Sequence, residues 1–421
     1  MSTGPYRHLE YLPEPEDPRM LTAIDPDAPG YPPEAYGATA SQAEEWRQAT
    51  SDTLRDNPPR PWGMLLVMAF IAGLMMAYPT VVTYFADALT PDSKWAYEDT
   101  NIRSLKADFS LTGEGVNVCI VDTGIDISHP DFSEVNLLGF KDFISGSNSP
   151  KDYGNDFHGT MMAGILVAKG STFTGAAPGV GLIIAAALDE DGQTQSESAV
   201  AQAISWCWQD MDADIISLSL GGDPNRDDPL GSQTASAVSN ALDHGVFVVA
   251  AAGNSGGTNS GVIDVSIPAN VDGVIAVGAV DENENLWNQT AIGSLTEGTD
   301  GETRLYPHQK PEVSAPGVEI VSTSNPDLAV PYSVSTGTSD STVFVTGALA
   351  LILERHGDAL TRNGLNMDRS DIDLVKRALA DSCRASTIQN DQHHPKYGYG
   401  MLDASAWEVA VADEIAIRGD T

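Results

Sequence analysis

The sequence predicts an α/β protein with a doubly wound, mostly parallel sheet that is flanked by helices and preceded by one transmembrane helix. Three features carry this prediction: short, near-continuous apolar runs, amphipathic segments between those runs, and one long uncharged apolar stretch before residue 87. Strands of a parallel sheet are buried on both faces, so they read as unbroken apolar runs. Alternation of such strands with helices is typical of a doubly wound sheet.

The composition describes a globular protein with a strongly acidic surface. The chain has 421 residues, of which 42% are hydrophobic, and its 59 Asp and Glu against 22 Lys and Arg give a formal net charge of −37. We expect no nucleic-acid partner, because few cations are available to neutralise phosphates. A surface of this kind is found in salt-adapted proteins, and a halophilic protein and a merely acidic one both fit it. The oligomeric state is not indicated.

The N-terminal region divides into a tail, an apolar run and a linker. Residues 1–60 are rich in Pro, Glu and Asp, which predicts a disordered acidic tail. Residues 61–86 hold an uncharged apolar run, and about 20 such residues suffice to cross a bilayer, so we expect a transmembrane helix there and a linker over 87–94. A buried core helix is one alternative, but few soluble helices stay apolar on every face for this length.

A cleaved signal peptide is the other alternative for this run. The apolar region of a signal peptide is about 7–15 residues long behind a short basic start, whereas this start is long and acidic. Ala86-Asp87-Ala88 does resemble a cleavage site. Arg47, Arg55 and Arg60 precede the run and only Lys94 follows it closely, which predicts a cytoplasmic N-terminus. The expected location is therefore the cell membrane, with one pass and the region after residue 86 outside the cytoplasm.

Residues 95–412 are expected to form one α/β domain, followed by a C-terminal tail over 413–421. The predicted strands are the apolar runs at 116–122, 182–188, 214–220, 246–253 and 273–280. The predicted helices lie at 158–169, 196–210 and 234–245, and after Ser339. Reactive groups in open parallel sheets gather outside the carboxyl ends of the strands, so candidate catalytic residues are expected there.

Three sequence blocks carry such residues. Asp122 ends a predicted strand, His158 opens a predicted helix, and Ser339 stands at another helix start. A hydroxyl, an imidazole base and a carboxylate that orients the imidazole are what a nucleophilic triad requires. Each residue alone has an ordinary interpretation, as a turn former or a helix cap. Together they indicate hydrolysis by an activated serine.

These blocks resemble those of subtilisin-like serine proteases, in which the three residues follow in the order Asp, His, Ser. The resemblance covers roughly residues 95–411 and implies a subtilisin-like fold and a serine endopeptidase that acts through an acyl-enzyme. Asn254, in VVAAAGNSG, then corresponds to the oxyanion-hole amide. The stretches KPEVSAPG and YGYGMLDA are similar to further landmarks of the family. A catalytically silent surface protein of the same fold, which binds extended peptides, is the alternative.

The resemblance also implies where a protein or peptide substrate binds. Two edge segments would pair with an extended peptide by strand addition: Gln193, Thr194 and Gln195 in one, and Ser219, Leu220 and Gly221 in the other. Ala252, Gly253 and Ser266 would line the pocket for P1, the residue before the scissile bond. Because none of these is charged, we expect cleavage after uncharged, mostly apolar residues. Simple loops are the alternative interpretation of these segments.

The chain departs from the family in ways that bear on the site. Asp340 follows Ser339 where Met is usual, and a carboxylate there is expected to raise the basicity of His158. The chemistry requires no cofactor. The loop AKGSTFTGAAPG lacks the oxygen ligands of the tight calcium site, and Asp131 alone cannot supply the roughly six to eight that calcium needs. No metal ligand is therefore assigned, and structural calcium elsewhere stays open. The three cysteines, Cys119, Cys207 and Cys383, allow at most one disulfide.

Overall fold

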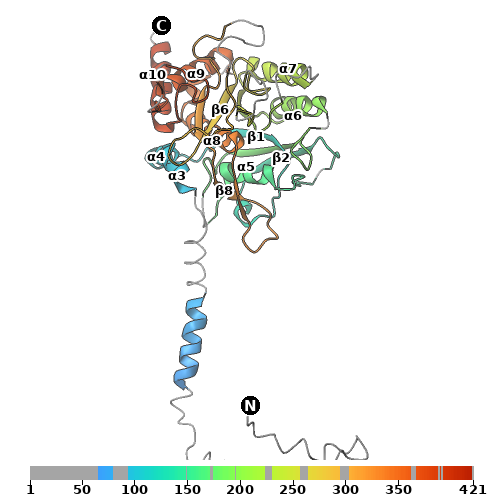
Figure 1. The fold of residues 1–421 in the computed structure, drawn as a ribbon, viewed down its shortest axis with the longest axis vertical. Coiled ribbons are helices and arrows are strands. Elements are labelled where there is room, and N and C mark those ends of the chain that lie inside the picture. Colours follow the sequence, from blue (N-terminus) through green and yellow to red (C-terminus); the bar gives the residue numbers. More distant parts are fainter. Residues whose placement is uncertain are drawn as a thin grey trace, which may run out of the picture. The chain divides into compact units, whose positions relative to one another are not determined.

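The computed structural model of the protein describes residues 65–78, 93–147, 149–170, 174–194, 196–222, 230–256, 264–293, 303–361, 367–386, 389 and 392–419. They belong to two compact units, Met1–Thr90 and Pro91–Thr421. In the first unit they form one helix over 65–78, drawn in blue in Figure 1, with every residue exposed. No helix within the described ranges is both long enough and apolar enough to cross a membrane. The rest of the predicted run over 61–86, and the predicted tail over 1–60, lie outside the described residues.

The second unit is built on a parallel sheet of seven strands. They are β1 (Asn117–Asp122), β2 (Leu137–Asp142), β3 (Gly181–Ala186), β4 (Ile215–Leu218), β5 (Phe247–Ala251), β6 (Ile275–Val280) and β7 (Val313–Pro316). Their order is β2-β3-β1-β4-β5-β6-β7, and every neighbouring pair is parallel. The order reverses between β1 and β4, so the predicted doubly wound sheet is confirmed.

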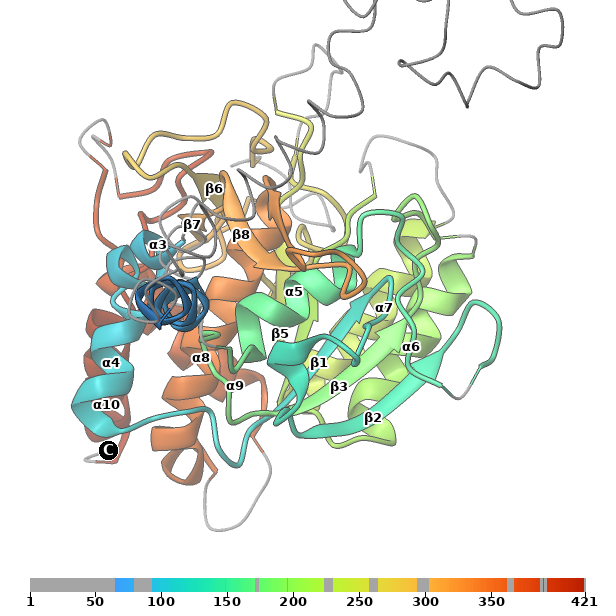
Figure 2. The ribbon, with the colours of Figure 1, turned by 90° about the horizontal axis from the view of Figure 1, so that it is seen from below.

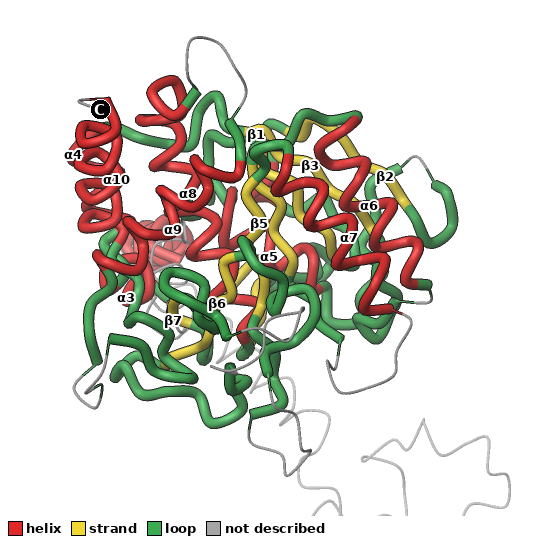
Figure 3. Tube along the Cα trace, turned by 90° about the horizontal axis from the view of Figure 1, so that it is seen from above, coloured by secondary structure: helices red, strands yellow, loops and turns green. Residues whose placement is uncertain are grey.

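Two pairs of helices cover the two faces of the sheet. One pair is α5 (His158–Val167) and α8 (Thr338–Leu360), and the other is α6 (Glu197–Gln209) and α7 (Leu230–Asp243). Figures 2 and 3 show the two pairs on opposite faces. Nine of the ten residues of α5 are buried, because this helix packs against β1, α8 and β8. Burial on nearly all sides explains why α5 is apolar after Thr160.

The remaining elements close the domain around this sandwich. They are α3 (Lys94–Asp99), α4 (Ile102–Phe109), the short 3₁₀ helix η4 (Pro130–Phe132), α9 (Arg369–Ser382), α10 (Ala404–Gly419), and the antiparallel hairpin of β8 (Ile320–Thr323) and β9 (Tyr332–Ser335). Asp368 and Asp371 form a capping box at the start of α9. Helix α10 packs on α9 and α8 and includes residues 413–419.

One disulfide joins the sheet to a helix. Cys119 in β1 is bonded to Cys207 in α6, and Cys383, at the end of α9, is free. The two bonded cysteines lie 88 residues apart in the sequence. The structure thereby selects one of the three pairings that the sequence allows.

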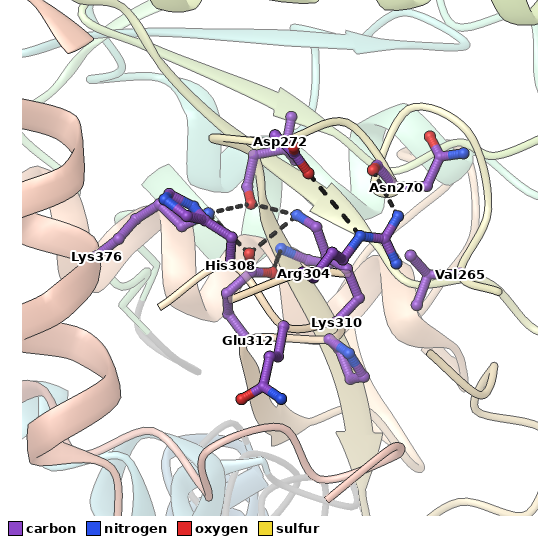
Figure 4. Close-up of polar contacts among 12 residues, drawn as sticks. Val265, Asn270, Asp272, Arg304, His308, Lys310, Glu312 and Lys376 are labelled. Carbon is purple, nitrogen blue, oxygen red and sulfur yellow. Dashed lines mark hydrogen bonds and ion pairs between the residues drawn. The ribbon is translucent and has the colours of Figure 1, made fainter. Parts of the chain in front are cut away.

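A buried ionic cluster ties the sheet to α9, and Figure 4 shows its members. The ammonium groups of Lys310 and Lys376 lie 2.9 Å and 2.7 Å from Oε1 of Glu312, and all three side chains are at most 1% exposed. Both lysines also donate to the carbonyl oxygen of Val274, at 2.6 Å and 3.0 Å. The other carboxylate oxygen of Glu312 accepts from the Ala276 N–H at 2.7 Å. Sequence analysis did not identify this cluster.

Candidate active site

Asp122 and His158 are brought together by a close approach of backbone to backbone. The start of α5 packs on the turn after β1, where a Cβ added to Gly159 would lie only 2.2 Å from the carbonyl oxygen of Gly124. Only a glycine fits at this contact, so the packing of α5 on the turn after β1 requires Gly159 directly after His158. Nδ1 of His158 lies 2.8 Å from Oδ1 of Asp122. The carboxylate is fully buried and also accepts from the Thr123 N–H at 2.7 Å.

Ser339 lies in the first turn of α8 and faces the same cavity as His158. This cavity has a volume of about 570 Å³, and Asn254 and Asp340 also line it. The hydroxyl of Ser339 donates to the carbonyl oxygen of Ser219 at 3.3 Å, and among the described residues it makes no hydrogen bond to His158. The structure therefore places three of the predicted groups around one cavity, with the serine hydroxyl directed toward the end of β4.

Asn254 follows β5, and Thr338 holds its side chain in place. The amide oxygen of Asn254 accepts from the Thr338 N–H at 3.1 Å and from the Thr338 hydroxyl at 2.8 Å. The same hydroxyl accepts from the Gly253 N–H at 3.1 Å. Because the amide oxygen is engaged by Thr338, the NH₂ group is the part of the amide left to donate near Ser339. Sequence analysis missed the role of Thr338, although its place directly before Ser339 was a signal.

The carboxylates around His158 decide its protonation. Burial alone would lower the pKa of His158. The charge of Asp122, which is also its hydrogen-bond partner, and the charges of Asp340 and Asp156 outweigh this effect and raise the pKa to about 9. Burial raises the pKa of Asp340 to about 6, although the Ser335 hydroxyl that donates to it and the charge of His158 act in the opposite direction. The predicted influence of Asp340 on His158 therefore has a physical basis in their shared cavity.

The predicted P1 residues lie together. The Ser266 N–H donates to the carbonyl oxygen of Ala252 at 2.8 Å. A Cβ on Gly221 would lie 2.6 Å from Cβ of Ser266, and a Cβ on Gly253 would lie 2.1 Å from its hydroxyl oxygen. The Ser266 side chain thus occupies the space between two glycines. Ser219 and Leu220 lie directly after the end of β4, beside these residues.

The other predicted edge segment is engaged in its own turn. The N–H of Gln193 donates to the Asp189 carboxylate at 3.0 Å, and its carbonyl oxygen accepts from the Asp189 N–H at 2.8 Å. The Thr194 hydroxyl donates to the carbonyl oxygen of Ser196 at 2.8 Å. Gln195 lies outside the described residues.

Arg304 anchors the segment that carries Ser266. Its guanidinium donates two 2.8 Å hydrogen bonds to the carboxylate of Asp264 and a third, also of 2.8 Å, to the carbonyl oxygen of Asn270. In Figure 4, Arg304 reaches toward Asn270 and Asp272. Planar, bidentate pairs of this kind fix geometry as well as charge. Sequence analysis missed Arg304, because it is distant in sequence from the residues it binds.

In the part of the chain that the structure describes, no group of three or more His, Cys, Asp and Glu side chains is arranged to hold a metal ion. The carboxylate of Asp131 accepts a 2.9 Å hydrogen bond from the Tyr332 hydroxyl. Its main-chain oxygen accepts from the Lys169 N–H at 2.9 Å. Asp131 therefore has partners from the protein itself.

Comparison with known proteins agrees with this geometry. Residues 113–400 match the sequence profile described as "Subtilase family". The chain is 33% identical over 276 residues to "Serine protease AprX" of Bacillus subtilis (strain 168), which covers 59% of this chain and 59% of that protein. It is 38% identical over 247 residues to "Subtilisin DY" of Bacillus licheniformis, which covers 58% of this chain and 78% of that protein. The match thus spans less than two thirds of AprX. With a matching profile over most of its length and the strand order found above, this chain belongs to the subtilase family.

Proposed function

We propose that the protein is a serine endopeptidase that hydrolyses peptide bonds through Asp122, His158 and Ser339. The observation that carries the proposal is the 2.8 Å contact between Asp122 and Nδ1 of His158, with Ser339 on the same cavity. A hydrogen bond at Nδ1 leaves Nε2 as the nitrogen that accepts a proton. In the proposed mechanism, the Ser339 hydroxyl turns from the carbonyl oxygen of Ser219 toward that nitrogen.

The reaction then follows in two halves. His158 takes the proton of the Ser339 hydroxyl as its oxygen attacks the peptide carbonyl, and Asp122 stabilises the resulting imidazolium. Asn254 donates from its NH₂ group to the oxyanion. His158 passes the proton to the leaving amine, which leaves an acyl-enzyme on Ser339. Water, deprotonated by His158, hydrolyses the ester and restores the hydroxyl.

A silent peptide-binding protein is the second candidate, and one observation favours it: the Ser339 hydroxyl is directed at Ser219 rather than at His158. A fluorophosphonate probe distinguishes the two, because it reacts only with a serine whose hydroxyl is activated by a base. We expect the wild type to be labelled and Ser339→Ala not to be, while circular dichroism shows both folded. A folded wild-type protein that is neither labelled nor able to cleave casein would contradict the proposed enzyme.

We further propose that the apolar run over 61–86 anchors the protein in a membrane, with the second unit, Pro91–Thr421, outside the cytoplasm. This second unit, which holds the candidate active site, is called the catalytic unit below. Two observations support this. The apolar side chains of the helix over 65–78 are exposed, as those of a lipid-facing helix must be in the absence of lipid. The catalytic unit contains the disulfide between Cys119 and Cys207, and disulfides persist mainly in oxidising compartments.

The anchor is tested by fractionation. We expect the protein to stay in the membrane fraction through washing with alkaline carbonate, and protease added to intact cells to reach the catalytic unit but not the N-terminal tail. Deletion of residues 61–86 should release the protein. A mature protein that is soluble, with its N-terminus near Leu89, would replace the anchor by a cleaved signal peptide.

A further inference from the structure

The cavity beside Ser339 extends away from the predicted P1 residues. Its walls come from residues 155–158, from the β8–β9 hairpin with the loop between its strands, and from the first turn of α8. Figure 2 shows β8 beside α5. Ser219, Gly221, Gly253 and Ser266 do not line it, so it is a space separate from the P1 residues.

His158 indicates which part of a substrate enters this cavity. In the proposed mechanism, His158 gives its proton to the nitrogen of the leaving amine, so this nitrogen must lie within hydrogen-bond distance of the imidazole. His158 lines the cavity. The residue that follows the scissile bond, P1′, carries that nitrogen and therefore directs its side chain into the same space.

The charge of the cavity is negative. Asp340 is 1% exposed and lies at its inner wall, where the Ser335 hydroxyl donates to its carboxylate. Asp156 is exposed at the rim. The described lining residues include no Lys or Arg, and apart from His158 the others are neutral. Among the described lining residues, the cation beside this buried carboxylate is the His158 imidazolium, which Asp122 already pairs, so the carboxylate favours a ligand that supplies a second cation.

The shape of the cavity fits a long cationic side chain. Leu328 and Val334, both about half exposed at 52% and 51%, line it. Lys and Arg side chains place their methylene stems along apolar surface while the charged end reaches a polar group. The volume of about 570 Å³ is ample for either.

We propose that Asp340 makes this cavity a P1′ subsite that selects Lys or Arg in the residue after the scissile bond. The inference rests on the proposed peptidase function and adds a selectivity on the leaving-group side. Asp340 touches the substrate in this arrangement, and Ser335 positions it.

The selectivity should depend on pH in a defined direction. The titratable groups that face Asp340 in the cavity are His158 and Asp156, with Asp122 behind His158. Because burial raises the pKa of Asp340 to about 6, its charge is lost as the pH falls through that value, and the preference for a cation should be lost with it. Protonation of His158 lowers the rate for every substrate alike, so it cancels in the ratio of two substrates.

The test compares two peptides that differ only at P1′, one with Lys and one with norleucine, whose side chain has similar length without the charge. The full-length enzyme should show a kcat/KM ratio of about tenfold or more in favour of Lys at pH 8, as expected of a desolvated charge pair. Asp340→Asn should reduce this ratio to near one. Ser335→Ala, which keeps the carboxylate, should retain a preference for Lys, and Asp126→Asn, outside the cavity, should leave the ratio unchanged.

The outcomes separate the two levels of the proposal. Labelling by the fluorophosphonate probe shows, for each variant, that the serine is reactive. If Asp340→Asn is labelled and cleaves with the same ratio as the wild type, the subsite is overturned while the peptidase stands. If Asp126→Asn lowers the ratio as much as Asp340→Asn, general surface charge is responsible and the subsite is likewise overturned. If no protein is labelled and neither peptide is cleaved, the proposed function and this inference fall together.

Discussion

Replacing Glu312 with Gln should destabilise the catalytic unit strongly, because this carboxylate is the common partner of two buried ammonium groups. Burial alone would raise the pKa of Glu312, but Lys310 and Lys376 hold it below its usual range, so the group is ionised at neutral pH. The substitution keeps the size and the capacity to accept one hydrogen bond from Ala276. What it removes is the negative charge at 2.9 Å and 2.7 Å from the two lysines.

The magnitude follows from these contacts. Each hydrogen bond to a charged group contributes about 1.5–3 kcal/mol, so two give roughly 3–6 kcal/mol. Breaking a buried ion pair by removing one partner costs about 3–5 kcal/mol, which agrees. The carbonyl of Val274 still accepts from both lysines, which offsets part of the loss. We therefore expect Glu312→Gln to lower the free energy of unfolding by about 3–5 kcal/mol.

The assay is equilibrium unfolding in urea, in a Ser339→Ala background that prevents self-digestion. Asp243→Asn serves as the matched control, because Asp243 pairs with Arg369 on the surface, where 56% and 41% of the two side chains are exposed. Exposed pairs contribute only about 0–1 kcal/mol and weaken with salt. The reasoning is refuted if Glu312→Gln costs no more than this control, or if its effect disappears in 1 M salt.

Three further outcomes are expected. Ser339→Ala and His158→Ala should each reduce kcat by a similar factor, on the order of 10⁶, and the double variant should lose little more, since triad members act as a unit. Near-native turnover of the His158 variant would exclude His158 as the base. Because the pKa of His158 is raised to about 9 and only the neutral imidazole accepts a proton, kcat/KM should rise with pH up to about that value. Asp340→Asn should move this rise to lower pH, because it removes a negative charge that raises the pKa of His158. An unchanged pH profile would show that Asp340 does not affect the pKa of His158. Ser266→Gly should open the space between two glycines and increase kcat/KM for Phe over Ala at P1, and an unchanged ratio would show that Ser266 does not limit this pocket.

The sequence by itself determined the central strands, the helices around them and the family. Strands β1, β3, β4, β5 and β6 are buried almost completely, and burial on both faces forces the apolar runs that predicted them. The candidate catalytic residues were identifiable because each stands where a local pattern changes, at the end of a strand or the start of a helix. Such a change of pattern depends only on residues that are adjacent in the sequence, so it can be recognised without the fold.

Only the tertiary structure decided the features that join distant parts of the chain. The edge strand β2 is only partly buried, and β7 contains Ser314 and Pro316, so neither produces a clear apolar run. Three kinds of contact depend on which segments the fold places side by side. They are the ion pairs of Glu312, the hydrogen bonds from Arg304 to Asp264, and the disulfide between Cys119 and Cys207. Asp340 is visible in the sequence as an unusual neighbour of Ser339, but its burial in a cavity without Lys or Arg among the described lining residues is a property of the fold. Charge and hydrogen bonding act over a few ångströms in space, and the sequence specifies those distances only through the folded chain.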